Sequence, residues 1–296
     1  MKNFSIELKE NYSIGRFTAM ACPCEILLES TNKQDIQTVT EIACKEARRI
    51  EQKFSRYTDD NIIYQINNAN GKLINVDKET GLMLDFATQC YELSHGSFDI
   101  TSGILRRVWN FDGSDNIPPQ QVINSLKSKI GWHKAKWDTP SLYLPKDMEL
   151  DLGGIGKEYA VDSTVKLLKQ YTEKSFLVNF GGDIACPSPR KNNTPWSIGV
   201  DDPHKTGEHS VGKIDLFQGG LATSGDARRY LLKDGIRYSH ILDPFTGYPV
   251  PDAPRSVTVI ADTCIEAGML STFAMLEGSN AVEFLKEQDV QFWVVP

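Results

Sequence analysis

The second half of this 296-residue chain alternates short β-type runs with glycine clusters, and this pattern restricts the possible folds more than any other feature. The clusters are Asp-Leu-Gly-Gly-Ile-Gly at 151–156, Asn-Phe-Gly-Gly-Asp at 179–183 and Thr-Ser-Gly-Asp at 223–226. Glycine lets a backbone approach a ligand closely, and a helix that begins after such a cluster presents free N–H groups to an anion. Each cluster taken alone is also explained as a tight turn capped by its own Ser or Asp. Three in one chain favour a pocket lined by backbone.

Hydrophobic periodicity predicts strands and helices in both halves of the chain. The predicted strands are 3–12, 15–29, 142–145, 148–152, 176–180, 196–200, 211–217, 221–224, 228–233, 237–242 and 255–261. The predicted helices are 34–54, a short one around 62–66, 78–94, 120–129, 157–171, 265–277 and 279–287. The charged face of the 34–54 helix, which includes Glu46, Arg49 and Lys53, is interpreted as a solvated surface. Length alone permits one large domain or two small ones, but no linker or repeat divides the chain, so we expect a single α+β domain over residues 1–296.

Charge and composition exclude several classes of protein. The net charge of −7 makes a nucleic-acid partner unexpected, although a local cationic pocket for a phosphate is not excluded. No run reaches the roughly 18 apolar residues that span a bilayer, so the protein is not expected to be integral to a membrane. The first twelve residues carry four charges where a signal peptide is apolar, so the sequence as it stands predicts a cytoplasmic protein. If an export signal has been removed, the expectation becomes a periplasmic or lipid-anchored protein.

Cysteines and aromatic residues receive structural interpretations. The six cysteines are scattered, and only Cys22 and Cys24 are close in sequence, in a spacing that matches neither a zinc knuckle nor a redox pair. They are interpreted as a turn with buried thiols. The aromatic pair Trp109 and Phe111 is interpreted as part of a core.

The segment from Tyr238 to Pro249 is the most polar of the motif-like regions. A His at a strand end is usually a hydrogen-bonded structural residue, but an ordinary pKa of roughly 6.5 also makes His240 a candidate proton carrier. A P-loop is rejected, because Asp151 and Glu158 stand where that motif needs a Gly and a Ser or Thr.

Taken together and in order, these segments resemble the ApbE family, the FAD:protein FMN transferases. The resemblance covers nearly the whole chain. Its motifs lie at 18–24, 54–57, 96–101, 150–157, 178–183, 224–230, 238–249 and 270–272. It implies an ApbE-like, T-fold-related domain with mixed and antiparallel sheets and flanking helices.

The resemblance also implies an activity and a set of site residues. The enzyme would bind FAD, cleave its pyrophosphate with Mg²⁺, attach FMN to a Thr or Ser of a target flavoprotein and release AMP. Lys157 would place a cation and a helix N-terminus at the pyrophosphate, and His240 would help to take the proton of the acceptor hydroxyl. The residues implied to line the flavin and adenosine are Met20, Ser55, Arg56, Tyr57, Asp99, Asp183 and Asp226.

One position departs from the family pattern. The family places a carboxylate four residues before the last Thr, so that both side chains and a carbonyl of the glycine-rich turn bind Mg²⁺. Here Thr272 and Gly156 are present, but Gly268 stands where the acid is expected. Two hypotheses follow. The first is a working transferase in which Glu266 reaches the metal because a glycine loosens the helix start; the second is an FAD-binding protein with weakened or lost transferase activity.

Overall fold

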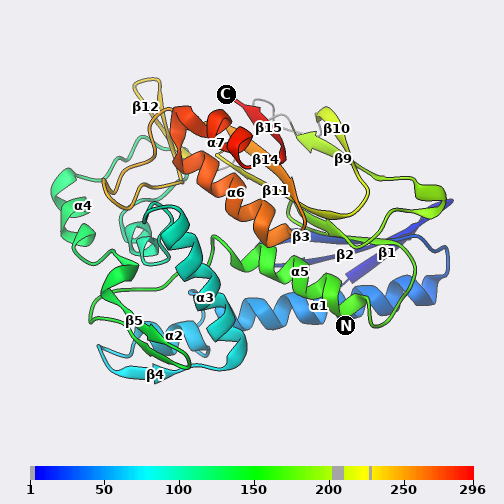
Figure 1. The fold of residues 1–296 in the computed structure, drawn as a ribbon, viewed down its shortest axis with the longest axis horizontal. Coiled ribbons are helices and arrows are strands. Elements are labelled where there is room, and N and C mark those ends of the chain that lie inside the picture. Colours follow the sequence, from blue (N-terminus) through cyan, green and yellow to red (C-terminus); the bar gives the residue numbers. More distant parts are fainter. Residues whose placement is uncertain (1–3, 202–209, 227–228) are drawn as a thin grey trace.

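A central antiparallel sheet of eight strands organises the computed structural model, which describes residues 4–201, 210–226 and 229–296 (Figure 1). Every neighbouring pair in it is antiparallel. In spatial order the strands are β1 (Phe4–Leu8), β2 (Ser13–Ala19), β3 (Cys22–Leu28), β7 (Phe176–Phe180), β8 (Asp183–Cys186), β11 (Gly219–Gly225), β14 (Ser256–Ala261) and β15 (Gln291–Val295). The α+β fold predicted from the sequence is therefore confirmed. Strands from both ends of the chain meet in one sheet.

Alternating side chains on β7 explain why the sheet is covered on both faces. Phe176, Val178 and Phe180 belong to the main core, whereas Leu177 between them belongs to a separate cluster on the opposite face. Successive residues of a strand point to opposite faces. The apolar run at 176–178 is therefore the expected signature of a strand that is buried on both sides.

Three helices cover one face of the sheet, where the main core lies (Figure 1). They are α1 (Lys33–Phe54), α5 (Gly156–Leu168) and α6 (Cys264–Leu276). The approach of α6 requires Gly220 on β11, because a Cβ there would lie 2.2 Å from the backbone nitrogen of Cys264. The opposite face is covered by the hairpin of β9 (Trp196–Asp201) and β10 (Ser210–Leu216).

Most of the remaining elements form a smaller region beside the three-helix layer (Figure 1). They are α2 (Ile62–Asn67), β4 (Leu73–Asn75), α3 (Lys78–Leu93), α4 (Gln120–Lys127), β5 (Lys136–Asp138), β6 (Ser141–Tyr143), β12 (Tyr230–Lys233) and β13 (Ile236–Ser239). The last helix, α7 (Ala281–Glu287), instead packs against α6 and the main core. A second core cluster in the smaller region contains Trp109, whose ring stacks on Phe111 at 5.6 Å and whose Nε1 donates to the Gly247 carbonyl. The prediction that this aromatic pair belongs to a core is confirmed.

The strand predicted at 15–29 is wrong in one respect: it is two strands joined by a tight turn. Met20 and Ala21 both have positive φ, near 51° and 55°, and they reverse the chain between β2 and β3. The predicted Cys22-Pro23-Cys24 turn is consequently wrong as well, since these residues begin β3. Non-glycine residues rarely adopt this conformation, so local propensity could not indicate the turn.

Other boundaries also differ. Residues 148–152 form no strand, while β4, β5, β8 and β15 were not predicted. The predicted 228–233 strand begins at Tyr230, and residue 228, with Ala227 of the same motif, lies outside the described residues. Across the part of the chain that the structure describes, helices long and apolar enough to cross a membrane are absent.

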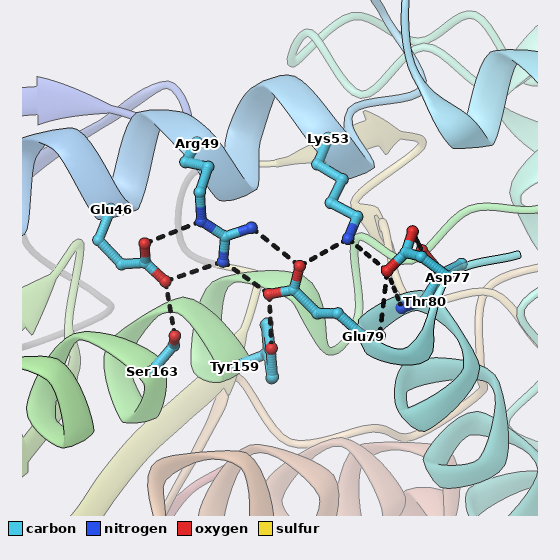
Figure 2. Close-up of polar contacts among 8 residues, drawn as sticks. All are labelled: Glu46, Arg49, Lys53, Asp77, Glu79, Thr80, Tyr159 and Ser163. Atoms are coloured by element: carbon cyan, nitrogen blue, oxygen red, sulfur yellow. Dashed lines mark hydrogen bonds and ion pairs between the residues drawn. The ribbon is translucent and has the colours of Figure 1, made fainter.

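The sequence suggested that the charged face of α1 is only a solvated surface, but side chains of this face also join three helices (Figure 2). Arg49 bonds Glu46 on its own helix and reaches Glu79 in the first turn of α3 at 2.6 Å. Lys53 pairs with Glu79 and Asp77. From α5, Tyr159 donates to Glu79 at 2.8 Å, so this ion-pair network ties α5 to both α1 and α3.

Candidate functional site

A cavity of about 1700 Å³ is lined by residues of the central sheet, of β9, of the helices α1, α5 and α6 and of the smaller region, and so by both halves of the chain. It is larger than the roughly 300–1000 Å³ of ordinary small-molecule pockets. Nine of the predicted site residues line it: Met20, Ser55, Arg56, Tyr57, Asp99, Gly156, Lys157, His240 and Thr272. Segments more than 200 residues apart in sequence therefore meet in one cavity, as a single pocket requires.

Three other singled-out positions, Asp183, Asp226 and Gly268, do not line the cavity but contact residues that do. Asp183 is buried against Lys157. Asp226 is buried between Arg237 and Arg255, at 2.9 and 2.7 Å. These two carboxylates hold cations of the cavity wall in place. Gly268 on α6 lies against Glu158 of the lining.

The first turn of α5 brings the glycine-rich segment to the cavity. No side chain in the described residues caps this helix at its N-cap, Ile155. Gly156, Lys157 and Glu158 follow directly and all line the cavity. An uncapped helix N-terminus beside a Lys is a suitable environment for an anionic group.

Lys157 and two carboxylates form a compact charged cluster under the cavity. The Lys157 ammonium lies 2.7 Å from Oδ2 of Asp183. Burial alone would lower the pKa of Lys157, but Asp183 and Glu158 outweigh it, so the pKa is raised and the ammonium stays charged. Burial raises the pKa of both carboxyls, and their mutual proximity adds to this for Glu158.

Glu158 is the residue that sequence reasoning missed, and it lies against Gly268. A Cβ at 268 would be 2.6 Å from Cγ of Glu158 and 3.2 Å from its Oε1. Oε2 of Glu158 is buried and has no hydrogen-bond partner among the described residues. The one feature of the sequence that could have indicated a role for Glu158 is its position directly after Lys157, at the end of the glycine-rich motif.

The expectation that Glu266 reaches into the site is wrong. The helix α6 runs unbroken from Cys264 to Leu276, and Asp162 accepts hydrogen bonds from its first two N–H groups, those of Cys264 and Ile265, so the start of the helix is not loosened. Glu266 is not among the residues that line the cavity. Thr272 does line it, and its hydroxyl lies 3.0 Å from that of Ser224 on β11.

His240 lies among cations at another part of the cavity. Burial lowers its pKa to about 4, and the charges of Arg106 and Arg229 act in the same direction. The imidazole is therefore neutral at pH 7. Its Nδ1 atom is buried, and no described residue is a hydrogen-bond partner for it.

Arginines make much of the cavity wall cationic, and most of them were not singled out from the sequence. The cationic side chains in the lining are Arg56, Arg106, Lys157, Arg229, Arg237 and Arg255. Several are fixed by hydrogen bonds: Arg56, for example, donates to the Gly103 carbonyl at 2.7 Å and to Asp151 at 3.1 Å. The lining also holds five acidic side chains, Glu25, Glu51, Asp99, Asp151 and Glu158, so these cations lie in a wall of mixed charge.

Other residues predicted to contact the flavin or adenosine already use polar atoms in hydrogen bonds within the protein. Asp99 accepts from Thr101 through Oδ1 and from the Trp132 amide through Oδ2, so both of its oxygens are engaged within the protein. The Met20 amide donates to Glu51, and Ser55 accepts from the amide of Tyr57. The Tyr57 ring is 77% exposed at the edge of the cavity.

The donor atoms in this region fit a hard divalent cation. Within residues 4–201, 210–226 and 229–296, no three His, Cys, Asp or Glu side chains converge in a metal-binding arrangement. A metal here would instead use backbone carbonyl, hydroxyl and single carboxylate oxygens, which are the ligands that Mg²⁺ accepts. The buried Oε2 of Glu158, for which the described residues offer no hydrogen-bond partner, is consistent with such a site.

Comparison with known proteins gives one consistent result. The sequence profile of the ApbE family matches residues 20–294. The FAD:protein FMN transferase of Haemophilus influenzae is 28% identical over 256 residues, which are 82% of this chain and 74% of that protein. The protein of the same name from Escherichia coli K12 is 29% identical over 83% of this chain and 73% of its own length. The crystal structure of the ApbE protein of Thermotoga maritima superposes with a TM-score of 0.85 at 32% identity, covering 96% of this chain and 94% of that one.

Proposed function

The chain belongs to the ApbE family, and on that premise we propose that it is an FAD:protein FMN transferase. Its substrates would be FAD and a protein that presents a Thr or Ser hydroxyl. The observation that carries the proposal is the large cavity in which family-motif residues from both halves of the chain meet six cationic side chains. FAD carries a pyrophosphate with two negative charges between two flat ring systems, and this cavity offers a volume of about 1700 Å³ and cations to pair with the phosphates.

The reaction is a phosphoryl-type transfer. The acceptor oxygen forms a bond to the phosphorus on the flavin side, the bond between that phosphorus and the bridging oxygen breaks, and AMP leaves with the bridging oxygen. The acceptor proton must be taken up as this happens. In such a transfer the protein contributes mainly positioning and charge compensation.

Three groups of this chain have roles in that step. Lys157, held by Asp183 at 2.7 Å, and the N-terminus of α5 stabilise negative charge on the pyrophosphate oxygens. His240 is neutral at pH 7 and its Nδ1 has no partner among the described residues, so the ring has a lone pair available for the hydroxyl proton. Gly156, through its carbonyl, and Thr272, through its hydroxyl, would hold Mg²⁺, whose charge offsets that of the phosphates.

Mass spectrometry of a target protein tests the proposal. The protein is incubated with FAD, Mg²⁺ and a flavoprotein subunit with an acceptor Thr, and a copy of the target with Thr replaced by Val serves as the control. We expect covalent FMN on the first target only, with one AMP released per FMN attached. FAD that remains intact and bound throughout would instead support an FAD-binding protein without transferase activity.

A matched pair of variants on α5 tests the role of Lys157. Lys157→Gln removes the cation beside the glycine-rich turn and should weaken FAD binding and transfer. Lys166→Gln makes the same change at an exposed position of the same helix and should alter neither. Equal FAD affinities for the two variants would contradict the assignment.

A further inference from the structure

The position that lacks the expected acid is not empty space, because the side chain of Glu158 fills it. A Cβ placed on Gly268 would lie 2.6 Å from Cγ, 3.1 Å from Cδ and 3.2 Å from Oε1 of Glu158. Atoms this close cannot coexist without a shift of the Glu158 side chain. A carboxylate that projected from 268 and the carboxylate of Glu158 would therefore compete for the same region between α5 and α6.

The remaining oxygen donors lie on the same two helices. Gly156 begins α5 two residues before Glu158. Thr272 follows Gly268 by four residues, so the two positions lie on the same face of α6 about one turn apart. Gly156, Glu158 and Thr272 all line the cavity.

Glu158 and the neighbouring carboxylate of Asp183 differ in the partners of their oxygens. The buried carboxylate next to it, Asp183, is already paired with Lys157 at 2.7 Å. Oε2 of Glu158 has no hydrogen-bond partner among the described residues, although the atom is buried. A buried carboxylate oxygen without a partner is costly unless a ligand completes it.

We propose that Glu158 supplies, from α5, the carboxylate ligand of a divalent cation that an acid at position 268 would otherwise supply from α6. This inference rests on the proposed function, since the cation is the Mg²⁺ of that reaction. The ligand set is the Glu158 carboxylate with the Gly156 carbonyl and the Thr272 hydroxyl. Gly268 is then not a defect of the site, because its lack of a side chain is what gives Glu158 room to enter.

Binding of Mn²⁺ in place of Mg²⁺, followed by electron paramagnetic resonance with and without FAD, tests the ligand directly and needs no turnover. Glu158→Gln keeps the shape of the side chain but removes its charge. We expect it to raise the Kd for Mn²⁺ by about 10-fold or more, since even the outer partners of metal ligands are worth about 10–100-fold. Glu266→Gln, the same change on α6 at a residue outside the cavity lining, should leave the Kd within about twofold.

Three results would overturn the inference. One is a wild-type protein that binds no Mn²⁺ in either condition. Another is a Glu158→Gln variant that binds it as tightly as the wild type, which would indicate that Glu158 only shares a proton with Asp183. The third is a loss of Mn²⁺ binding in Glu266→Gln.

Moving the carboxylate between helices is a second, independent test. Gly268→Asp alone should lower the thermal stability of the metal-free protein, because its Cβ collides with Glu158. The double variant Glu158→Ala, Gly268→Asp should regain that stability and should bind Mn²⁺ at least about 10-fold more tightly than Glu158→Ala alone. A Gly268→Asp variant as stable as the wild type, or a double variant that binds Mn²⁺ no more tightly than Glu158→Ala, would refute the idea that the two carboxylates occupy the same place.

The two levels of the proposal fail separately. Mn²⁺ binding that depends on Glu158 in a protein that transfers no FMN would uphold the ligand and reject the transferase. Full FMN transfer by Glu158→Gln, with unchanged Mn²⁺ affinity, would do the reverse.

Discussion

Replacing Glu79 by Gln should weaken the junction of three helices, and the structure allows the size of the effect to be worked out. One oxygen of Glu79 accepts from Arg49 at 2.6 Å and Tyr159 at 2.8 Å, and the other from Arg49 at 2.8 Å and Lys53 at 2.6 Å (Figure 2). Hydrogen bonds from Arg49 in the first place, and then from Lys53 and Tyr159, lower the pKa of Glu79 to about 2 against the opposing effect of burial. Glutamine keeps the shape of the side chain but removes its charge.

The lowered pKa sets a ceiling on the loss. The gap between about 2 and the ordinary 4.5 corresponds to at most about 3.4 kcal/mol. The Arg49 side chain is 45% exposed, so solvent screens its contribution. We assign about 0.5 kcal/mol to the ion pair with each of the two cations, about 0.5 kcal/mol to the hydrogen bond from Tyr159 and about 0.5 kcal/mol to an acid in the first turn of α3. Glu79→Gln should therefore lower the free energy of unfolding by about 2 kcal/mol. For a chain of this length that is a melting temperature lower by about 3 °C.

Urea denaturation at several pH values is the assay, because the charge gives the effect a pH signature. Because the pKa of Glu79 is lower in the folded protein than in the unfolded chain, its charge stabilises the fold above about pH 4.5, and this stabilisation is lost as the pH falls toward 2. The difference in free energy of unfolding between wild type and Glu79→Gln should therefore narrow below pH 4.5, and it should also shrink in 1 M salt. Glu283→Gln, which removes an exposed pair with Lys286, should cost nothing measurable. A Glu79→Gln deficit that is absent, or that stays constant with pH and salt, would refute this account.

Three further predictions concern residues around the sheet and the cavity. Gly220→Ala should lower the free energy of unfolding by about 3 kcal/mol or more, because its Cβ would meet backbone atoms at the start of α6, and urea titration would show this. Asp226→Asn should cost about 2–3 kcal/mol by the same assay, since two arginines lose the buried carboxylate that they share; an unchanged unfolding midpoint would contradict this. His240 has a folded-state pKa of about 4, below its ordinary 6.5, so the wild type should lose stability relative to His240→Gln as the pH falls below 6.5. The difference in the free energy of unfolding should reach about 3 kcal/mol at pH 4. Parallel curves of unfolding free energy against pH for the two proteins would show that His240 is not buried in its neutral form.

Helices were predictable from the sequence to within a few residues. The 34–54 helix corresponds to α1 (Lys33–Phe54), and the 78–94 helix to α3 (Lys78–Leu93). Their apolar residues recur at helical spacing because one face of each packs on a core, and side chains of Asn32 and Asp77 cap their first turns. Short strands such as β4 and β5 have no comparable signature, since three residues cannot show a period.

The candidate site was only partly predictable. The order of the glycine-rich motifs identified the family, and most of the site residues singled out from those motifs line the cavity. The arginines of the wall could not be singled out, because a surface arginine and a pocket arginine look alike in sequence. Charged residues on α1 were misread for the same reason: their partners lie on α3 and α5, far away along the chain (Figure 2).

The sequence by itself determined the family, the α+β class, the main helices and the absence of an acid at position 268. Only the tertiary structure decided what that absence means. Residues 158 and 268 are 110 positions apart, and nothing local to either relates them. They meet because α5 and α6 pack side by side on one face of the sheet, so that a side chain missing from one helix makes room for a carboxylate from the other. Periodicity and propensity are properties of neighbours along the chain, whereas the space between two helices depends on the packing of the whole core.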